Sequence, residues 1–205
     1  MASKETFTIR TPSSSANIGP GFDVIGLALS IYLELTVTID RSGGTSSHPL
    51  NCRLTYEGEG EDSGDITLDP SRNLITRVAL YVLRCHNQRA FPAETHVHIK
   101  NPIPLGRGLG SSGAAVVAGV MLGKEVGGLH HLDKDRLFDF CLMIGTCLIL
   151  LPSGADFHSP SSSNIHTPLL PEQRMGRTAD LFDSCRTTPR QRGRGTLRRL
   201  RRHVS

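Results

Sequence analysis

Apolar and polar side chains alternate along several stretches of this 205-residue chain. The clearest is the range 31–40, in which every second residue is apolar: Ile31, Leu33, Leu35, Val37 and Ile39. A period of two with one polar face predicts a strand whose sheet is covered on one side, and hence an antiparallel or mixed sheet. Shorter runs predict further strands over 6–10, 54–56 and 95–100.

Helical spacing appears between and after these strands. Following Asn73, apolar side chains recur at Leu74, Ile75, Val78, Tyr81 and Val82. This predicts a helix with Asn73 as its N-cap; the alternative is that the Asn73 amide contacts a ligand, and the spacing favours the cap. Small residues predict a second helix over 112–126, packed closely against the sheet. Asp133 is expected to cap a third helix, with these residues buried: Leu137, Phe138, Cys141 and Leu142.

Two polar stretches are candidates for chemistry. Residues 11–23, T-P-S-S-S-A-N-I-G-P-G-F-D, are interpreted as a loop between strands. The loop offers the amide of Asn17 and the carboxylate of Asp23 on a stiff backbone, a combination suited to binding a small polar ligand. By contrast, His96 and His98 share one strand face without a third metal ligand nearby, so we expect them on a solvent-facing surface.

The second stretch is a glycine-rich turn that opens the helix over 112–126. Four glycines, at positions 106, 108, 110 and 113, lie within P-L-G-R-G-L-G-S-S-G-A, residues 104–114, which we call the glycine loop. Glycines let a ligand approach the backbone, and the helix N-terminus favours an anion such as phosphate. Because no lysine follows, the loop is not a Walker A motif, and G-x-G-x-x-G alone is weak evidence for a dinucleotide fold. Close packing of helix and strand is the alternative role for these glycines.

The glycine loop, together with S-S-A-N-I-G-P-G-F-D at 14–23, resembles the signatures of the GHMP kinases, and within them of fungal homoserine kinases. The resemblance covers residues 6–144. It implies an α/β (α+β) fold: an incomplete GHMP-kinase N-terminal domain, with the ribosomal-protein S5 domain-2-like mixed sheet and helices on one side. The family's ferredoxin-like C-terminal domain is expected to be absent.

The resemblance also implies roles for individual residues. It implies ATP contacts at Asn73, Pro104, Leu105, Gly106, Arg107, Gly108, Leu109, Gly110, Ser111, Ser112, Gly113 and Ala114. Backbone N–H groups of the loop would hold the phosphates, Ser112 would bind Mg²⁺, and Asn73 would lie near adenine. Asn17 and Asp23 match positions that bind L-homoserine. The reaction implied is transfer of the γ-phosphoryl group of ATP to the homoserine hydroxyl, in threonine biosynthesis.

After residue 144 the pattern stops. The family continues with Glu-x-His-Pro-Asp-Asn, whose glutamate binds Mg²⁺, but this chain reads G-T-C-L-I-L-L-P-S-G. Codons for Gly145-Thr146-Cys147 can contain an intron start, and those for Cys185-Arg186 an intron end. With one consistent choice of synonymous codons, reading on one frame over gives Glu-Arg-His-Pro-Asp-Asn. The hypothesis is that 145–185 translate an intron and 186–205 are out of frame. We expect 145–205 to be a disordered, non-homologous tail and the chain to have negligible kinase activity.

Other functions remain open at this point. The chain could be a catalytically dead fragment that only binds nucleotide, or a GHMP kinase for another small molecule such as mevalonate, which residues 14–23 disfavour. Ten of the arginines lie in 145–205, which suggests nucleic-acid binding by the tail, but no aromatic residue is interleaved among the arginines of 186–205 for stacking.

Composition narrows the setting. The N-terminus lacks a signal-peptide core, and no stretch approaches the ~20 apolar residues of a membrane span. The five cysteines are odd in number and lack metal-ligand spacing, as expected for reduced thiols. We therefore expect a cytoplasmic protein that does not contact membranes, and the sequence leaves a homodimer open.

Overall fold

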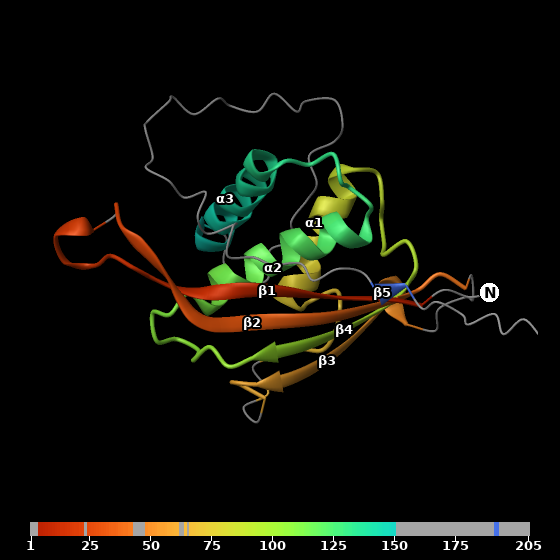
Figure 1. Cartoon of the computed structure of the whole chain (residues 1–205), viewed down its shortest axis with the longest axis horizontal. Coiled ribbons are helices and arrows are strands. Elements are labelled where there is room, and N and C mark those ends of the chain that lie inside the picture. Colours follow the sequence, from red (N-terminus) through yellow and green to blue (C-terminus); the bar gives the residue numbers. More distant parts are fainter. Residues whose placement is uncertain are drawn as a thin grey trace, which may run out of the picture.

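A mixed sheet with three α-helices on one face forms the structure (Figure 1). The computed structural model describes residues 4–22, 24–42, 48–61, 64, 66–150 and 191–192. The strands are β1 (Lys4–Ala16), β2 (Gly26–Asp40), β3 (Cys52–Gly58), β4 (Glu94–Asn101) and β5 (Gln191–Arg192). The helices are α1 (Leu74–Cys85), α2 (Ser111–Val126) and α3 (Lys134–Leu150).

The strands lie in the order β3-β4-β2-β1-β5. β3 and β4 run parallel, whereas β2 pairs antiparallel with both β1 and β4. The two-residue β5 pairs antiparallel with the start of β1. The sheet is therefore mixed, as the alternation over 31–40 predicts.

The predicted loop over 11–23 is wrong in its first part, because residues 11–16 continue β1 and pair with β2 as far as Ala16 opposite Gly26. The register shifts between Pro12 and Ser13. A proline is tolerated at such a bulge because the ladder hydrogen bond is already interrupted there. The second strand also begins earlier than residue 31, so β1 and β2 form a long hairpin that extends beyond the other strands (Figure 1).

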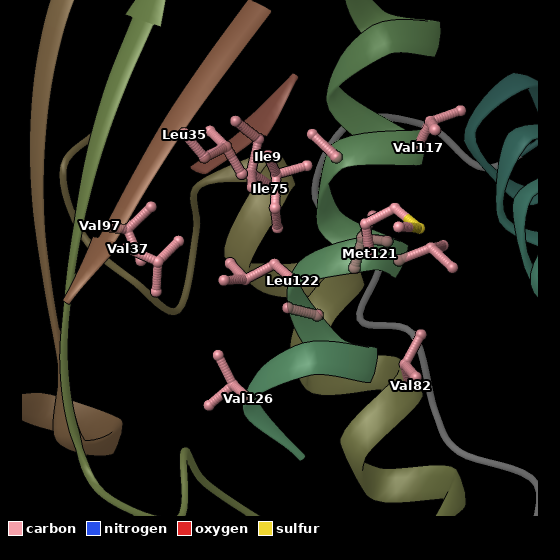
Figure 2. Close-up of a cluster of buried hydrophobic side chains, with 14 of the residues drawn as sticks. Ile9, Leu35, Val37, Ile75, Val82, Val97, Val117, Met121, Leu122 and Val126 are labelled. Atoms are coloured by element: carbon pink, nitrogen blue, oxygen red, sulfur yellow. The ribbon is translucent and has the colours of Figure 1, made fainter. Parts of the chain in front are cut away.

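The core lies between the sheet and the helices. Figure 2 shows Ile9, Leu35, Val37 and Val97 of the sheet facing α1 and α2. The predicted inward face of β2 is confirmed from Leu33 to Ile39. Ile31 is 38% exposed, because it lies toward the part of the hairpin that extends beyond β4. One covered face explains the strict alternation of β2.

Helices α1 and α2 pack closely because glycines of α2 face α1. A Cβ atom added at Gly119 would lie 2.6 Å from the Ile75 carbonyl oxygen. One added at Gly123 would lie 2.9 Å from the Ala79 carbonyl oxygen. The expected close packing by small residues is thus found between the two helices, rather than against the sheet alone.

The third helix begins where predicted. The Asp133 carboxylate accepts a hydrogen bond from the Arg136 N–H at 2.9 Å, as an N-cap does. Leu137 is buried, and Phe138 and Cys141 are half-buried against the core, but Leu142 is 41% exposed, so its predicted burial is wrong. The buried face follows the spacing 137, 141 and 144, and position 142 lies off that stripe.

Helix α3 continues past Ile144 to Leu150 without a break. Residues 151–190 and 193–205, for which we expect disorder, lie outside the described residues. Among the described residues, no helix combines the length and the apolar character that a membrane crossing requires.

Candidate functional site

The glycine loop connects β4 to α2 by left-handed turns. Gly106, Gly108 and Gly110 have φ angles of 66°, 71° and 66°. Side chains other than glycine are strained in this conformation, so the alternating glycines are a requirement of the backbone path. Gly110 is the N-cap of α2 and contributes no side chain to the cap. The first N–H groups of α2 therefore lack an intrahelical acceptor and, with the helix dipole, favour an anion.

The loop glycines fall into two groups. A Cβ atom at Gly106, Gly108 or Gly113 would meet no atom within 4 Å, so the backbone there is open to a ligand. A Cβ atom at Gly110 would lie 2.3 Å from the Ser14 hydroxyl oxygen. Gly110 is thus needed for packing within the protein, which agrees with the alternative role in part. The other three leave room for a ligand.

The charge around the loop also suits an anion. From position 95 to position 124 the chain contains no aspartate or glutamate. The loop itself carries Arg107, and Lys100 and Lys124 lie in the flanking elements. No carboxylate of this segment would therefore repel a phosphate group.

The end of β1 lies against the glycine loop. The Ser14 N–H donates to the Leu109 carbonyl oxygen at 3.0 Å. The Thr11 hydroxyl donates to the Ala114 carbonyl oxygen at 3.2 Å. In Figure 1 the loop between β4 and α2 lies at the same end of the sheet as the hairpin connection. The structure therefore brings together the two motifs on which the sequence resemblance rests.

The two candidate substrate residues, Asn17 and Asp23, come shortly after Ser14 in the sequence. Asn17 comes immediately after β1 and has a φ angle of 59°, so it turns the chain out of the strand. Asp23 lies outside the described residues. Nearby, the hydroxyl oxygen of Ser13 is fully buried and has no hydrogen-bond partner among the described residues.

Asn73 caps α1, as predicted. Its side-chain oxygen accepts from the Ile75 N–H at 3.0 Å, and its side-chain nitrogen donates to the Thr67 carbonyl oxygen at 2.9 Å. The residue is 5% exposed. Both ends of its amide are thus bonded to the protein backbone, and its role near adenine stays a prediction.

The two serines differ in their surroundings. Ser112 is exposed, whereas Ser111 is half-buried and its hydroxyl oxygen lies 3.4 Å from the side-chain nitrogen of Asn101. The sequence analysis assigned no role to Asn101, the last residue of β4. The signal that could have found it is a polar residue directly before Pro102 and Pro104, which lead into the glycine loop. The Asn101 amide also contacts Tyr56 and Ile103.

The described residues contain no group of three or more His, Cys, Asp or Glu side chains placed to hold a metal ion. Ser112, which the sequence resemblance predicts as a magnesium ligand, therefore has no such group of side chains beside it among the described residues. His96 and His98 lie half-exposed on the open face of the sheet, where both contact the Thr55 hydroxyl at 3.0 Å. This agrees with the surface role expected for them.

Known proteins resemble this arrangement. Residues 73–159 match the family model of the GHMP kinases N terminal domain. This match extends beyond residue 144, at which the sequence motifs end. The homoserine kinase of Candida albicans is 58% identical over 139 residues, covering 68% of this chain and 38% of the relative. That of Saccharomyces cerevisiae is 60% identical over 140 residues, covering 67% and 39%.

A solved structure agrees with these sequence matches. The crystal structure of homoserine kinase from Cytophaga hutchinsonii aligns with a TM-score of 0.54 and 26% identity, over 74% of this chain and 44% of that one. The chain thus spans about two fifths of the length of the curated relatives it matches.

Proposed function

Because residues 73–159 match the GHMP kinases N terminal domain, we propose that the glycine loop binds the phosphate groups of ATP. The observation that carries the proposal is the open backbone at Gly106, Gly108 and Gly113, at the start of α2. Loops of this kind hold phosphates by N–H donation and the helix dipole, which position the nucleotide and offset its charge.

The substrate that we propose is L-homoserine. The support is the identity of 58% over 139 residues and of 60% over 140 residues to two fungal homoserine kinases. Asn17 and Asp23 would bind this substrate, with the carboxylate of Asp23 paired to its ammonium or hydroxyl group. The contact between Ser14 and Leu109 places the start of this motif beside the loop, as phosphoryl transfer between two bound molecules requires.

Mg²⁺ is the second cofactor that we propose, with Ser112 as a ligand. When bound, it would neutralise negative charge on the phosphates. A serine hydroxyl alone does not hold a divalent cation, and the described residues contain no cluster of acidic ligands beside it. The residues present therefore fit part of a magnesium site.

We propose that this chain binds nucleotide but transfers phosphate negligibly. The glutamate expected as the second magnesium ligand does not occur at residue 145, which is glycine. A catalytically dead nucleotide-binding fragment is thus the second candidate function for the polypeptide itself. We further expect a cytoplasmic location, no binding of nucleic acid, and either a monomer or a homodimer, which light scattering distinguishes.

The experiment measures ATP binding and turnover separately. Titration of the purified chain with a fluorescent ATP analogue should show saturable binding that unlabelled ATP competes away. Homoserine-dependent ADP release should be near background. A second protein, in which residues 1–144 are followed by Glu-Arg-His-Pro-Asp-Asn and the rest of the reading frame, should phosphorylate homoserine and leave mevalonate unchanged. No ATP binding by either protein would refute the phosphate-loop proposal, and turnover of mevalonate alone would refute the substrate.

A further inference from the structure

A buried amide connects the sheet to the start of α2. Asn101 is the last residue of β4 and is 5% exposed. Its side-chain nitrogen lies 3.1 Å from the Tyr56 hydroxyl oxygen and 3.4 Å from the Ser111 hydroxyl oxygen, and its side-chain oxygen accepts from the Ile103 N–H at 3.2 Å. One side chain thus contacts β3, the segment before the loop, and the first residue of α2.

The surroundings hold Asn101 in this orientation. Its backbone carbonyl oxygen accepts from the Glu59 N–H at 2.9 Å, and in the parallel register it lies beside Gly58. The Tyr56 hydroxyl donates to the Glu59 carbonyl oxygen, so it can accept from the Asn101 amide. The Ile103 N–H requires an acceptor, which fixes the amide oxygen on that side and the amide nitrogen toward Ser111.

This orientation decides how Ser111 can bond. An amide nitrogen is a donor only, so the Ser111 hydroxyl oxygen must accept from it. The proton of that hydroxyl is then available for another acceptor. The distance of 3.4 Å is long for a hydrogen bond, and such contacts shorten when a ligand fills a site.

We propose that Asn101 is a positioning residue, which turns the Ser111 hydroxyl proton toward a phosphate oxygen of the bound nucleotide. This inference rests on the proposed function, since it requires phosphate at the glycine loop. Asn101 itself does not touch the nucleotide. It acts through Ser111, and Tyr56 and the Ile103 N–H keep its amide in place.

A double-mutant cycle on the full chain tests the proposal. Asn101→Ala should weaken binding of ATP and of inorganic triphosphate about five- to tenfold, as expected for loss of one hydrogen bond between uncharged groups. Binding of adenosine should be unchanged. In the Ser111→Ala background the same Asn101 substitution should change ATP affinity less than about twofold, because its effect passes through Ser111.

Two further variants keep the test decisive. Asn101→Asp keeps the acceptor for the Ile103 N–H, removes the donor to Ser111 and adds a negative charge, so it should lose more triphosphate affinity than Asn101→Ala. Thr95→Ala is the matched control: its buried hydroxyl donates to the Ala93 carbonyl oxygen at the opposite end of β4. It should lower stability and leave ATP affinity unchanged.

The outcomes distinguish failure of the proposed ATP binding from failure of the role proposed for Asn101. If the unsubstituted chain fails to bind ATP, the proposed function falls and this inference falls with it. If it binds ATP but Asn101→Ala and Asn101→Asp bind equally well, only the role of Asn101 is refuted. Additive losses in the cycle would likewise refute action through Ser111.

Discussion

The Ser14 N–H donates to the Leu109 carbonyl oxygen at 3.0 Å, and this bond joins the end of β1 to the glycine loop. β1 continues through the serine-rich stretch because this stretch pairs with β2 as far as Ala16, and the Ser14 N–H adds a bond to the loop. The same approach brings Gly110 against Ser14 so closely that a Cβ atom does not fit between them. Loop conformation and strand position therefore depend on each other.

Substitutions at two loop glycines should separate backbone strain from this contact. Both Gly108→Ala and Gly110→Ala place a side chain at positive φ, at a cost of about 1–2 kcal/mol each. Gly110→Ala should destabilise the protein further, because its Cβ atom meets the Ser14 hydroxyl oxygen, whereas Gly108 faces open space. Urea denaturation measures the difference. Ser14→Ala should recover part of the loss in Gly110→Ala and none in Gly108→Ala; equal stability of the two glycine variants would contradict the argument.

Within α2 the same substitution should have opposite effects at two positions. Gly113→Ala adds a methyl group in open space, so it should stabilise the helix by about 0.5–1 kcal/mol. Gly119→Ala places a Cβ atom 2.6 Å from the Ile75 carbonyl oxygen and should destabilise by about 1–3 kcal/mol, since α1 must move away. Thermal melts followed by circular dichroism compare the two. A stabilised Gly119→Ala would show that the helices are not in such close contact.

Asn73 should contribute to stability through both ends of its amide. Asn73→Ala removes the cap on α1 and the bond to Thr67, and should cost about 1–2 kcal/mol. Asn73→Asp keeps the acceptor for the Ile75 N–H and adds a negative charge at the helix N-terminus, so its loss should be smaller at neutral pH. Chemical denaturation of the three proteins provides the comparison. An Asp variant as unstable as the Ala variant would assign the effect to the Thr67 bond instead.

The spacing of apolar residues predicted the strands and helices of the core well, because the sheet and the helices each bury one face against the other. The faces of β2 and the start of α1 follow directly from side-chain spacing and the cap. The serine-rich end of β1 could not be predicted, since its partners are in β2 and in the glycine loop, both distant in sequence. The contacts of the Asn101 side chain could not be predicted for a similar reason, because its three partners, Tyr56, Ile103 and Ser111, come from separate segments.

The open face of the sheet should make stability depend on pH. Burial lowers the pKa of His96, and nearby Arg53, His98 and His48 lower it further. The folded state therefore binds a proton at this site less readily than the unfolded chain. Its contribution to stability should be fully present above pH ~6.5 and be lost as the pH falls through the lower pKa of the folded state. His96→Gln, which still can bond to Thr55, should show a weaker loss between pH 7 and 5 in urea titrations. Identical pH profiles for the two proteins would refute this.

The transcript should show whether residues 145–185 are encoded by an intron. If 145–185 are translated from an intron, amplification of cDNA across this region should yield a shorter product beside the longer one. The translated shorter product should read Glu-Arg-His-Pro-Asp-Asn directly after Ile144. Its glutamate would be the second magnesium ligand that we expect beside Ser112. Genomic DNA is the control for the unspliced length. A transcript pool with the longer product alone, under conditions in which other introns are removed, would rule out the intron. The arginines after residue 185 would then require an explanation at the protein level, such as salt-dependent retention on RNA that disappears when 186–205 are deleted.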